Sequence, residues 1–564
     1  MKTPLAEVKN LSVIFQGQGA PAVNDVSFCI GKGEKVGIVG ESGSGKTLTA
    51  LSLIGLLPAA GKLKGEVIYH LPETGKIDLT KLEGKELLEI RGNNIGMIFQ
   101  EPMTSLNPAI KCGKQVMEVL EEHKDLKFDE ARKKVLRLFK EVKLPEPEEV
   151  YRSYPHQLSG GQKQRVMIAM AVACRPDLII ADEPTTALDV TVQKVILELL
   201  RDLSTRYGIS VLFISHDLGV IANIADRMMV MYRGKIVEQG KTDKIISSPK
   251  HPYTRGLLAC RPPLSGKPFR LPVLKDFLRH GNEAETGKTS KSRSGCYHGS
   301  TKLLSVSGLT TSFVSRRNIF GKTTREIVAV EDVSFDLFEG ETLGLVGESG
   351  CGKTSLGRSL IQLIKAGSGE VMYRDTRLDQ LKGNPLRKFR KNLQIIFQDP
   401  YSSLNPVLTA GESIMEPMTV HRLYHGRRQR EIKAYELLEK VALDPEHFNR
   451  YPHQFSGGQR QRIGIARALA VEPEMIICDE SVSALDVSVQ AQILNLLNDL
   501  KEEFGLTYLF ISHDLAVVRY MSDRLMVMEK GRIVESGVSE TIFKNPEKAY
   551  TQKLMQAIPR ISPD

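Results

Sequence analysis

The chain has 564 residues, more than one hydrophobic core accommodates, so its length predicts two or more domains. No apolar stretch approaches the roughly 20 residues that span a bilayer, and residues 1–8 lack the apolar core of a signal peptide, so we expect a cytosolic protein. A net charge of +10 permits contact with anionic lipid or nucleic acid, but a solvated lysine-rich surface explains it as well.

The apolar run over residues 35–39 predicts a strand that leads into a phosphate-binding loop of the pattern G-x-x-x-x-G-K-T, and the same arrangement returns after residues 342–346. Glycines in such a loop let backbone N–H groups turn inward around phosphate oxygens at a helix N-terminus. The lysine reaches the outer phosphates, and the threonine hydroxyl is placed to ligate Mg²⁺. We therefore predict two nucleotide sites, formed by Gly40, Ser42, Gly43, Gly45, Lys46 and Thr47 and by Gly347, Ser349, Gly350, Gly352, Lys353 and Thr354.

A second glycine-rich helix start follows in each half, and a helix-compatible basic run comes after it. A simple helix cap is one explanation of this motif. Because each half already holds a phosphate-binding loop, a second anion-binding helix start needs a different role. The residues are Ser159, Gly160, Gly161 and Gln162, and then Ser456, Gly457, Gly458 and Gln459.

Two carboxylates end a continuous apolar run in each half, namely Asp182 with Glu183 and Asp479 with Glu480. Such runs suit a buried parallel strand, and ligands bind at the carboxyl ends of strands in open α/β sheets. The aspartate can hold Mg²⁺, and the glutamate, on the other side of the strand's alternation, can polarise a water for in-line attack. The alternative is that each acidic pair is merely solvated, but the phosphate-binding loop in the same half argues against this interpretation.

Matching motifs recur 297 to 307 residues apart, which indicates two tandem copies of one domain. Residues 280–302 are rich in Gly, Ser, Thr and Lys and almost lack aliphatic side chains, a composition typical of a flexible linker. We therefore expect one domain with a C-terminal extension over residues 1–279 and a second over residues 303–564.

Together these motifs resemble the nucleotide-binding domain of ATP-binding cassette (ABC) proteins, and the resemblance covers nearly the whole chain. It implies an α/β fold in each half, with a RecA-like core, an antiparallel β subdomain and a helical subdomain. It also implies ATP and Mg²⁺ as cofactors, and two ATP molecules held head to tail between one phosphate-binding loop and the opposite Ser-Gly-Gly-Gln signature.

Further family elements match individual residues. Gln100 and Gln398 resemble the glutamine that senses Mg²⁺ and the attacking water, and His216 and His513 resemble the switch histidine at the γ-phosphate. The resemblance assigns Mg²⁺ to Thr47, Gln100 and Asp182 and to Thr354, Gln398 and Asp479, partly through water. Residues 187–189 and 484–486 resemble the D-loop that couples the two sites.

Two aromatic residues, Phe15 and Phe313, lie where the family stacks adenine, although a core role is the alternative. Both halves keep every catalytic part, so we expect two active sites. One departure is Ser481, which follows Glu480 where Pro184 follows Glu183, and it predicts a slightly more mobile second loop.

Two local features resemble the cassettes of oligopeptide, dipeptide, nickel and glutathione importers: residues 100–108 and 398–406, and the extension His-Pro-Tyr-Thr-Arg-Gly-Leu-Leu at 251–258, weakened at 549–554. The resemblance implies an ATPase on the cytoplasmic face of the membrane that works with two transmembrane permease subunits and, indirectly, a substrate-binding protein. No residue here is expected to touch the cargo. Cys260 and Cys296 are too few for an Fe–S cluster, so none is expected.

The alternative is a tandem ABC ATPase that acts on ribosomes or DNA. Ribosome-acting members carry a long, charged, helical linker, whereas the linker here is short and Gly/Ser-rich. DNA-repair members carry zinc-binding cysteine pairs, which this sequence lacks. The importer interpretation is therefore favoured, and nucleic acid is not an expected partner.

Overall fold

The computed structural model describes residues 4–17, 19–71, 75–185, 188–263, 266–280, 301–317, 323–483 and 485–558. Most of the linker expected over 280–302, together with Cys296, Ala187 and Ala484, lies outside these described residues. The chain divides into two compact units, one built mainly from Met1–Leu258 with Leu274–Glu283, the other from Ala259–Val273 with Ala284–Ile558.

Each half contains a six-stranded sheet in which five strands run parallel and one edge strand is antiparallel. In the first half the order is β10 (Lys235–Lys241), β9 (Arg227–Tyr232), β3 (Lys35–Val39), β8 (Ser210–Ser215), β7 (Leu178–Asp182) and β6 (Ile95–Ile98). In the second half it is β16 (Leu393–Ile396), β17 (Met475–Asp479), β18 (Thr507–Ile511), β13 (Thr342–Val346), β19 (Arg524–Glu529) and β20 (Arg532–Val538).

The central strands are buried on both faces, as their continuous apolar sequences predict. Every residue of β7, β8, β13, β17 and β18 is buried. The helices of each core are α1 (Lys46–Leu53), α8 (Val190–Tyr207) and α9 (Leu218–Ile224), with α13 (Lys353–Leu360), α18 (Val487–Phe504) and α19 (Leu515–Met521) in the second half. On one face of each core sheet, residues of the antiparallel sheet also join the apolar core.

A four-stranded antiparallel sheet accompanies each core sheet. Its strands are β2 (Val23–Gly31), β1 (Pro4–Phe15), β4 (Gly61–Leu71) and β5 (Gly75–Asp78), and then β12 (Thr323–Phe338), β11 (Lys302–Arg317), β14 (Ser368–Tyr373) and β15 (Thr376–Arg377). Val13 pairs with Val23, and Thr311 pairs with Val330, so the second hairpin is the longer one. This insertion explains why Phe313 lies farther from its lysine than Phe15 does.

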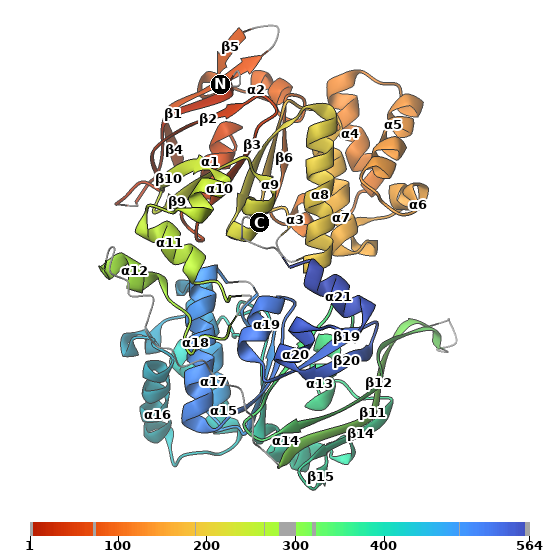
Figure 1. Ribbon diagram of the computed structural model, residues 1–564, viewed down its shortest axis with the longest axis vertical. Helices are drawn as coiled ribbons and strands as arrows, with labels where there is room; N and C mark the ends of the chain where they lie inside the picture. Colours follow the sequence, from red (N-terminus) through yellow and green to blue (C-terminus); the bar gives the residue numbers. More distant parts are fainter. Residues whose placement is uncertain are drawn as a thin grey trace. The chain divides into compact units, whose positions relative to one another are not determined.

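A helical subdomain completes each half. In the first half it contains α4 (Cys112–Lys124), α5 (Phe128–Glu141), α6 (Pro147–Arg152) and α7 (Gly160–Val172). In the second half it contains α15 (Ala410–Val420), α16 (Arg427–Lys440) and α17 (Gly457–Leu469). The short helices α2 (Lys85–Ile90), α3 (Pro102–Ser105) and α14 (Gly383–Asn392) precede these bundles. Within each half, Figure 1 shows the antiparallel sheet and the helical subdomain on opposite sides of the core sheet.

C-terminal extensions follow each core, formed by α10 (Thr242–Ser247), α11 (Pro252–Ala259) and α12 (Leu274–His280), and by α20 (Ser539–Lys544) and α21 (Ala549–Gln556). Residues 259–273 run from the last residue of α11 to α12, and we call them the docking segment; apart from 264 and 265, which lie outside the described residues, they belong to the second unit. There the Asn495 side chain accepts from the Leu271 N–H (2.9 Å) and donates to the Leu271 carbonyl (2.8 Å). Both residues are buried.

None of the helices in the described ranges combines the length and apolar composition that a membrane crossing requires.

Candidate functional site

The strand order places four predicted functional segments at one edge of each core sheet. The phosphate-binding loop follows β3 or β13, the histidine follows β8 or β18, the acidic pair ends β7 or β17, and the glutamine follows β6 or β16. Because these strands are parallel neighbours, their carboxyl ends lie at the same edge. Each half thus brings these four segments together at one edge, whereas its signature motif and its predicted adenine-stacking residue lie outside this group.

The phosphate-binding loops surround a buried lysine. Lys46 Nζ donates to the carbonyls of Gly40 (2.7 Å) and Glu41 (2.9 Å), and Lys353 Nζ donates to Gly347 (2.8 Å) and Glu348 (2.9 Å). The ammonium group of each lysine therefore contacts backbone oxygens of its own loop. The same positive charge attracts phosphate groups.

The loop conformation requires glycine at its closing position. Gly45 and Gly352 have φ of 100° and 109°, and a Cβ there would stand 2.8 Å from the Ala22 carbonyl oxygen or 2.0 Å from that of Ala329. By contrast, a Cβ on Gly43 or Gly350 would meet no heavy atom within 4 Å. The middle of each loop therefore faces open space, as a phosphate cradle requires.

A threonine–aspartate pair lies beside each lysine. Thr47 Oγ1 donates to Asp182 Oδ1 at 3.2 Å, and Thr354 Oγ1 donates to Asp479 Oδ1 at 2.9 Å. Burial raises the pKa of Asp182 to about 6, and it also raises the pKa of Asp479. Asp479 Oδ2 is buried and has no hydrogen-bond partner among the described residues. A hydroxyl beside a carboxylate oxygen of this kind fits the oxygen ligands that Mg²⁺ prefers.

The glutamate after each aspartate contacts both remaining predicted residues of its half. Gln100 Nε2 donates to Glu183 Oε2 at 3.1 Å, and the same oxygen lies 3.1 Å from His216 Nδ1. In the second half, Gln398 Nε2 donates to Glu480 Oε2 at 2.7 Å, and His513 Nδ1 lies 3.3 Å from that oxygen.

Charge coupling is evident in the second half. Burial acts to raise the pKa of Glu480, but the hydrogen bond and charge of His513 outweigh it and hold the pKa below its ordinary value. Burial acts to lower the pKa of His513, whereas its contact with Glu480 raises the pKa overall. The pair therefore stabilises an ionised carboxylate, which is the form that a general base needs.

These glutamates leave the extended backbone conformation of the strands that they follow. Glu183 has φ of 47° and Glu480 has φ of 48°, left-handed values that end the pleat. Their amides nevertheless continue the ladder by donating to the carbonyls of Ile214 and Ile511, each at 2.9 Å. Both carboxylates of each pair therefore serve the same edge of the sheet.

The signature motifs form capped helix starts on the surface. Ser159 Oγ accepts from the Gln162 N–H and the Gln162 side chain accepts from the Ser159 N–H, and Ser456 with Gln459 repeats this capping box. A Cβ on Gly458 would stand 2.4 Å from the Val489 side chain, so a larger residue there would displace that side chain. The cap interpretation and the anion-binding interpretation are therefore compatible.

The predicted adenine-stacking residues differ in their surroundings. Phe15 packs against the apolar core beneath the antiparallel sheet, whereas Phe313 is 42% exposed. In the first of the two predicted D-loops, Asp189 caps α8 by accepting from the Val192 N–H at 2.8 Å.

Sequence patterns alone did not reveal a role for Tyr253 and Tyr550, whose hydroxyls contact the backbone of the phosphate-binding loops. Their common 297-residue offset was the available signal.

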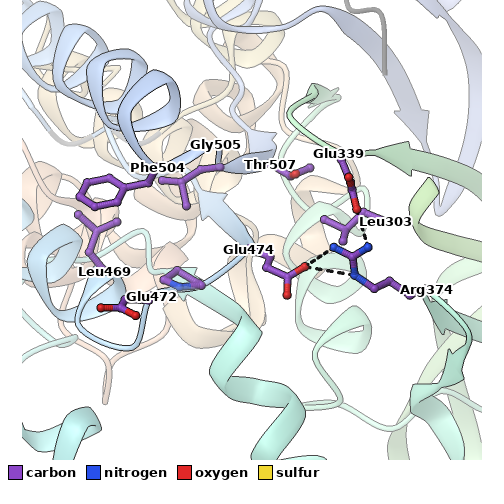
Figure 2. Close-up of a pocket in the computed structure, with 11 residues that line it drawn as sticks. Leu303, Glu339, Arg374, Leu469, Glu472, Glu474, Phe504, Gly505 and Thr507 are labelled. Carbon is purple, nitrogen blue, oxygen red and sulfur yellow. Dashed lines mark hydrogen bonds and ion pairs between the residues drawn. The ribbon is translucent and has the colours of Figure 1, made fainter. Parts of the chain in front are cut away.

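A separate cavity of about 330 Å³ lies at the amino ends of the strands in the second half, away from the phosphate-binding loop. Figure 2 shows Arg374 paired there with Glu339 (2.6 Å) and Glu474 (2.7 Å). Because two carboxylates already hold the guanidinium, this cavity does not offer phosphate a free cation.

Comparison with known families gives two matches in each half. The ABC transporter family matches residues 23–186 and 330–483. The family described as the C-terminal region of oligopeptide/dipeptide transporters matches residues 237–298 and 534–564, which include both extensions.

Curated relatives match over almost the full chain. The glutathione import ATP-binding protein GsiA of Pectobacterium atrosepticum is 48% identical over 568 residues, covering 99% of this chain and 90% of that protein. GsiA proteins of Salmonella typhimurium and Escherichia coli O157:H7 are each 47% identical over 565 residues, with the same coverage. These relatives favour the importer interpretation over action on ribosomes or DNA. The chain therefore belongs to the ABC transporter family, as a tandem-cassette ATPase of the oligopeptide/dipeptide importer group.

Proposed function

We propose that each cassette hydrolyses ATP with the residues gathered at its sheet edge, and that the cycle powers import of a peptide or related small solute. The observation that carries this proposal is the glutamate of each half, held between its glutamine and its histidine beside the threonine–aspartate pair. This arrangement is present twice, so both cassettes are proposed to be active.

The lysines Lys46 and Lys353 would turn from their backbone carbonyls to the outer phosphates of ATP. Mg²⁺, when bound, would lie against Thr47, Asp182 and Gln100, or against Thr354, Asp479 and Gln398, and would neutralise phosphate charge. Glu183 and Glu480 would each accept a proton from the attacking water, while His216 and His513 orient that glutamate and contact the γ-phosphate.

Completion of each site is proposed to come from the other cassette. Ser456, Gly457, Gly458 and Gln459 would close over ATP at Lys46, and Ser159, Gly160, Gly161 and Gln162 would close over ATP at Lys353. The exposed, capped helix starts support this role, because an exposed helix N-terminus attracts anions. Hydrolysis then adds charge repulsion that reopens the cassettes.

For transport, the chain would act at the cytoplasmic face of a membrane with two permease subunits, and a separate binding protein would select the cargo. The curated relatives are named for glutathione import, and glutathione is a tripeptide, so a short peptide is the proposed cargo class. The extension that marks the oligopeptide/dipeptide group supports the same class.

The catalytic proposal is tested with Glu183→Gln plus Glu480→Gln. Removing both general bases should lower ATP turnover at least about a hundredfold while ATP binding persists. Phosphate release and equilibrium binding of a fluorescent ATP analogue give the two measurements. Near wild-type turnover by the double variant would refute the assignment.

The transport proposal is tested by purifying the tagged double variant from its native cell in mild detergent with ATP. Mass spectrometry should identify two multi-span permeases in the purified complex. Ribosomal subunits or DNA-repair proteins without any membrane protein would overturn the importer function.

A further inference from the structure

The C-terminal extension of each cassette reaches back to the phosphate-binding loop of the same cassette. The Glu41 N–H donates to Tyr253 Oη at 3.0 Å, and the Glu348 N–H donates to Tyr550 Oη at 3.1 Å. Tyr253 lies in α11 and Tyr550 in α21, about two hundred residues after their partners. The second residue of each loop is therefore held by a side chain from outside the nucleotide-binding core.

The same loop residue is held on its other side by the catalytic lysine. Lys46 Nζ donates to the Glu41 carbonyl, and Lys353 Nζ donates to the Glu348 carbonyl, each at 2.9 Å. A lysine that turns to the phosphates of ATP gives up this backbone contact. The tyrosine contact does not involve the phosphates, so it can hold this loop residue both with and without bound ATP.

Tyr253 is itself firmly placed. Tyr253 is fully buried and its ring packs against Tyr232, with ring centroids 4.3 Å apart. The start of α11 is fixed by Glu238 of β10, whose two carboxylate oxygens accept from the Lys250 N–H (2.8 Å) and the His251 N–H (3.1 Å). The hydroxyl is thus presented to the loop by a rigid support.

The second cassette repeats the carboxylate anchor ahead of its tyrosine helix. Glu535 of β20 accepts from the Glu547 N–H (2.9 Å) and the Lys548 N–H (3.3 Å) ahead of α21. The helix that follows begins Ala-Tyr-Thr-Gln, where the first cassette has Pro-Tyr-Thr-Arg. The tyrosine contact is kept although its surroundings differ, so two independent copies in one chain give the same geometry.

We propose that Tyr253 and Tyr550 are positioning residues of the two ATP sites. Each holds the first turn of its phosphate-binding loop in the shape that receives the phosphates, so each extension sets the ATP affinity of its own cassette. This inference rests on the proposed ATP sites at Lys46 and Lys353. It assigns the oligopeptide/dipeptide-type extension a role in nucleotide binding.

The size of the effect follows from what a Tyr→Phe change removes. The ring and its packing stay, while the loop amide loses its acceptor in a part-buried position. An unsatisfied amide of this kind weakens the ordered loop, so ATP affinity should fall about fivefold to tenfold at the affected site.

The first experiment uses the nucleotide-free protein. Hydrogen–deuterium exchange of residues 40–47 should become at least about fivefold faster in Tyr253→Phe, and that of residues 347–354 should do so in Tyr550→Phe. Matched controls are Tyr69→Phe and Tyr508→Phe, which remove buried hydroxyls that donate to the carbonyls of Asn94 (3.3 Å) and Leu497 (2.9 Å). The controls should leave both loops unchanged. Unchanged exchange in the test variants would overturn the proposal.

The second experiment measures ATP binding in the Glu183→Gln/Glu480→Gln background, where turnover does not interfere. Tyr253→Phe should weaken one of two sites, Tyr550→Phe the other, and the combination both, while the control substitutions weaken neither. Faster loop exchange with unchanged affinity would reduce the tyrosines to a structural role and overturn the proposal. If the background protein bound no ATP, the proposed function would fail with it, and the exchange data would still report whether the contact exists.

Discussion

Glu183 and Glu480 each adopt a left-handed backbone conformation immediately after a buried strand. For a residue other than glycine this costs on the order of 1–3 kcal/mol. The amide of each glutamate still donates to the neighbouring strand, so the sheet holds the strained residue in place. Stability is thus given up at one residue per cassette to bring the carboxylate to the glutamine and the histidine.

Substitutions of Phe15 and Phe313 test whether these rings stack on adenine or only pack within the protein. Phe15→Ala should destabilise the protein by about 1–3 kcal/mol because Phe15 packs on the core, whereas Phe313→Ala should cost much less because its ring is 42% exposed. If both rings stack on adenine, each substitution should also weaken ATP binding. Thermal unfolding and nucleotide titration measure the two effects, and unchanged ATP affinity in both variants would leave only the core role.

At the scale of the element, each extension helix is joined to the core through a carboxylate on the antiparallel edge strand. Burial acts to raise the pKa of Glu238, but the neighbouring Thr254 and the amides of Lys250 and His251 outweigh it and lower the pKa below its ordinary value. The pKa of Glu535 is lowered by its equivalent neighbours. These contacts therefore favour the ionised carboxylate.

This direction predicts that acid loosens both extensions. A lowered folded-state pKa means that the contribution is complete above the ordinary pKa of 4.5 and is lost as the pH falls through the folded value. Proteolytic cleavage within 249–258 and 546–556 should therefore increase between about pH 5 and pH 3. Glu238→Gln keeps an acceptor but removes the charge, so cleavage of its extension should lose this pH dependence. Equal pH dependence in the variant would assign the effect to other groups.

At the scale of the whole molecule, the docking segment belongs by its contacts to the second unit although it follows the first cassette in sequence. Asn495 satisfies both backbone groups of Leu271, and its Oδ1 also accepts from the Tyr520 hydroxyl at 3.2 Å. The buried side chain of Asn495 thus satisfies the backbone hydrogen bonds of a residue that lies 224 positions away in sequence.

Asn495→Ala should therefore leave two buried backbone groups unpaired and cost about 2 kcal/mol or more. Limited proteolysis within residues 259–273 and thermal unfolding of the full chain measure the loss. Asn498→Ala is the matched control on the same helix, because Asn498 is also buried but its Nδ2 has no partner among the described residues. If the two substitutions destabilised the protein equally, the Leu271 contacts would add no stability beyond that of burying an asparagine side chain.

Much of the site was predictable because its residues end apolar runs that form parallel strands. Their motifs and common register identified Lys46, Asp182 and Glu183, and family resemblance added Gln100 and His216. The left-handed backbone of the glutamates was not predictable from periodicity, since a strand pattern implies an extended backbone, whereas hydrogen bonds to carbonyls of β8 and β18 help to hold the actual conformation.

Long-range contacts were the other part that the sequence concealed. Tyr253 and Asn495 look like ordinary helix residues, because their partners are backbone atoms that carry no side-chain signature. The longer β11–β12 hairpin was hidden for a similar reason, since hairpin length shifts a motif's spacing without changing the motif.

The position of Leu271 bears on how this chain can be divided into working fragments. If the gene is divided within the linker, the second fragment starts beyond residue 273 and lacks Leu271. The Asn495 side chain, which is buried in the full chain, then loses Leu271 as its hydrogen-bond partner. A fragment that begins at residue 259 would carry that partner with it. A border at residue 259 therefore keeps the Leu271–Asn495 contact within one fragment, whereas a border in the linker divides that contact between two fragments.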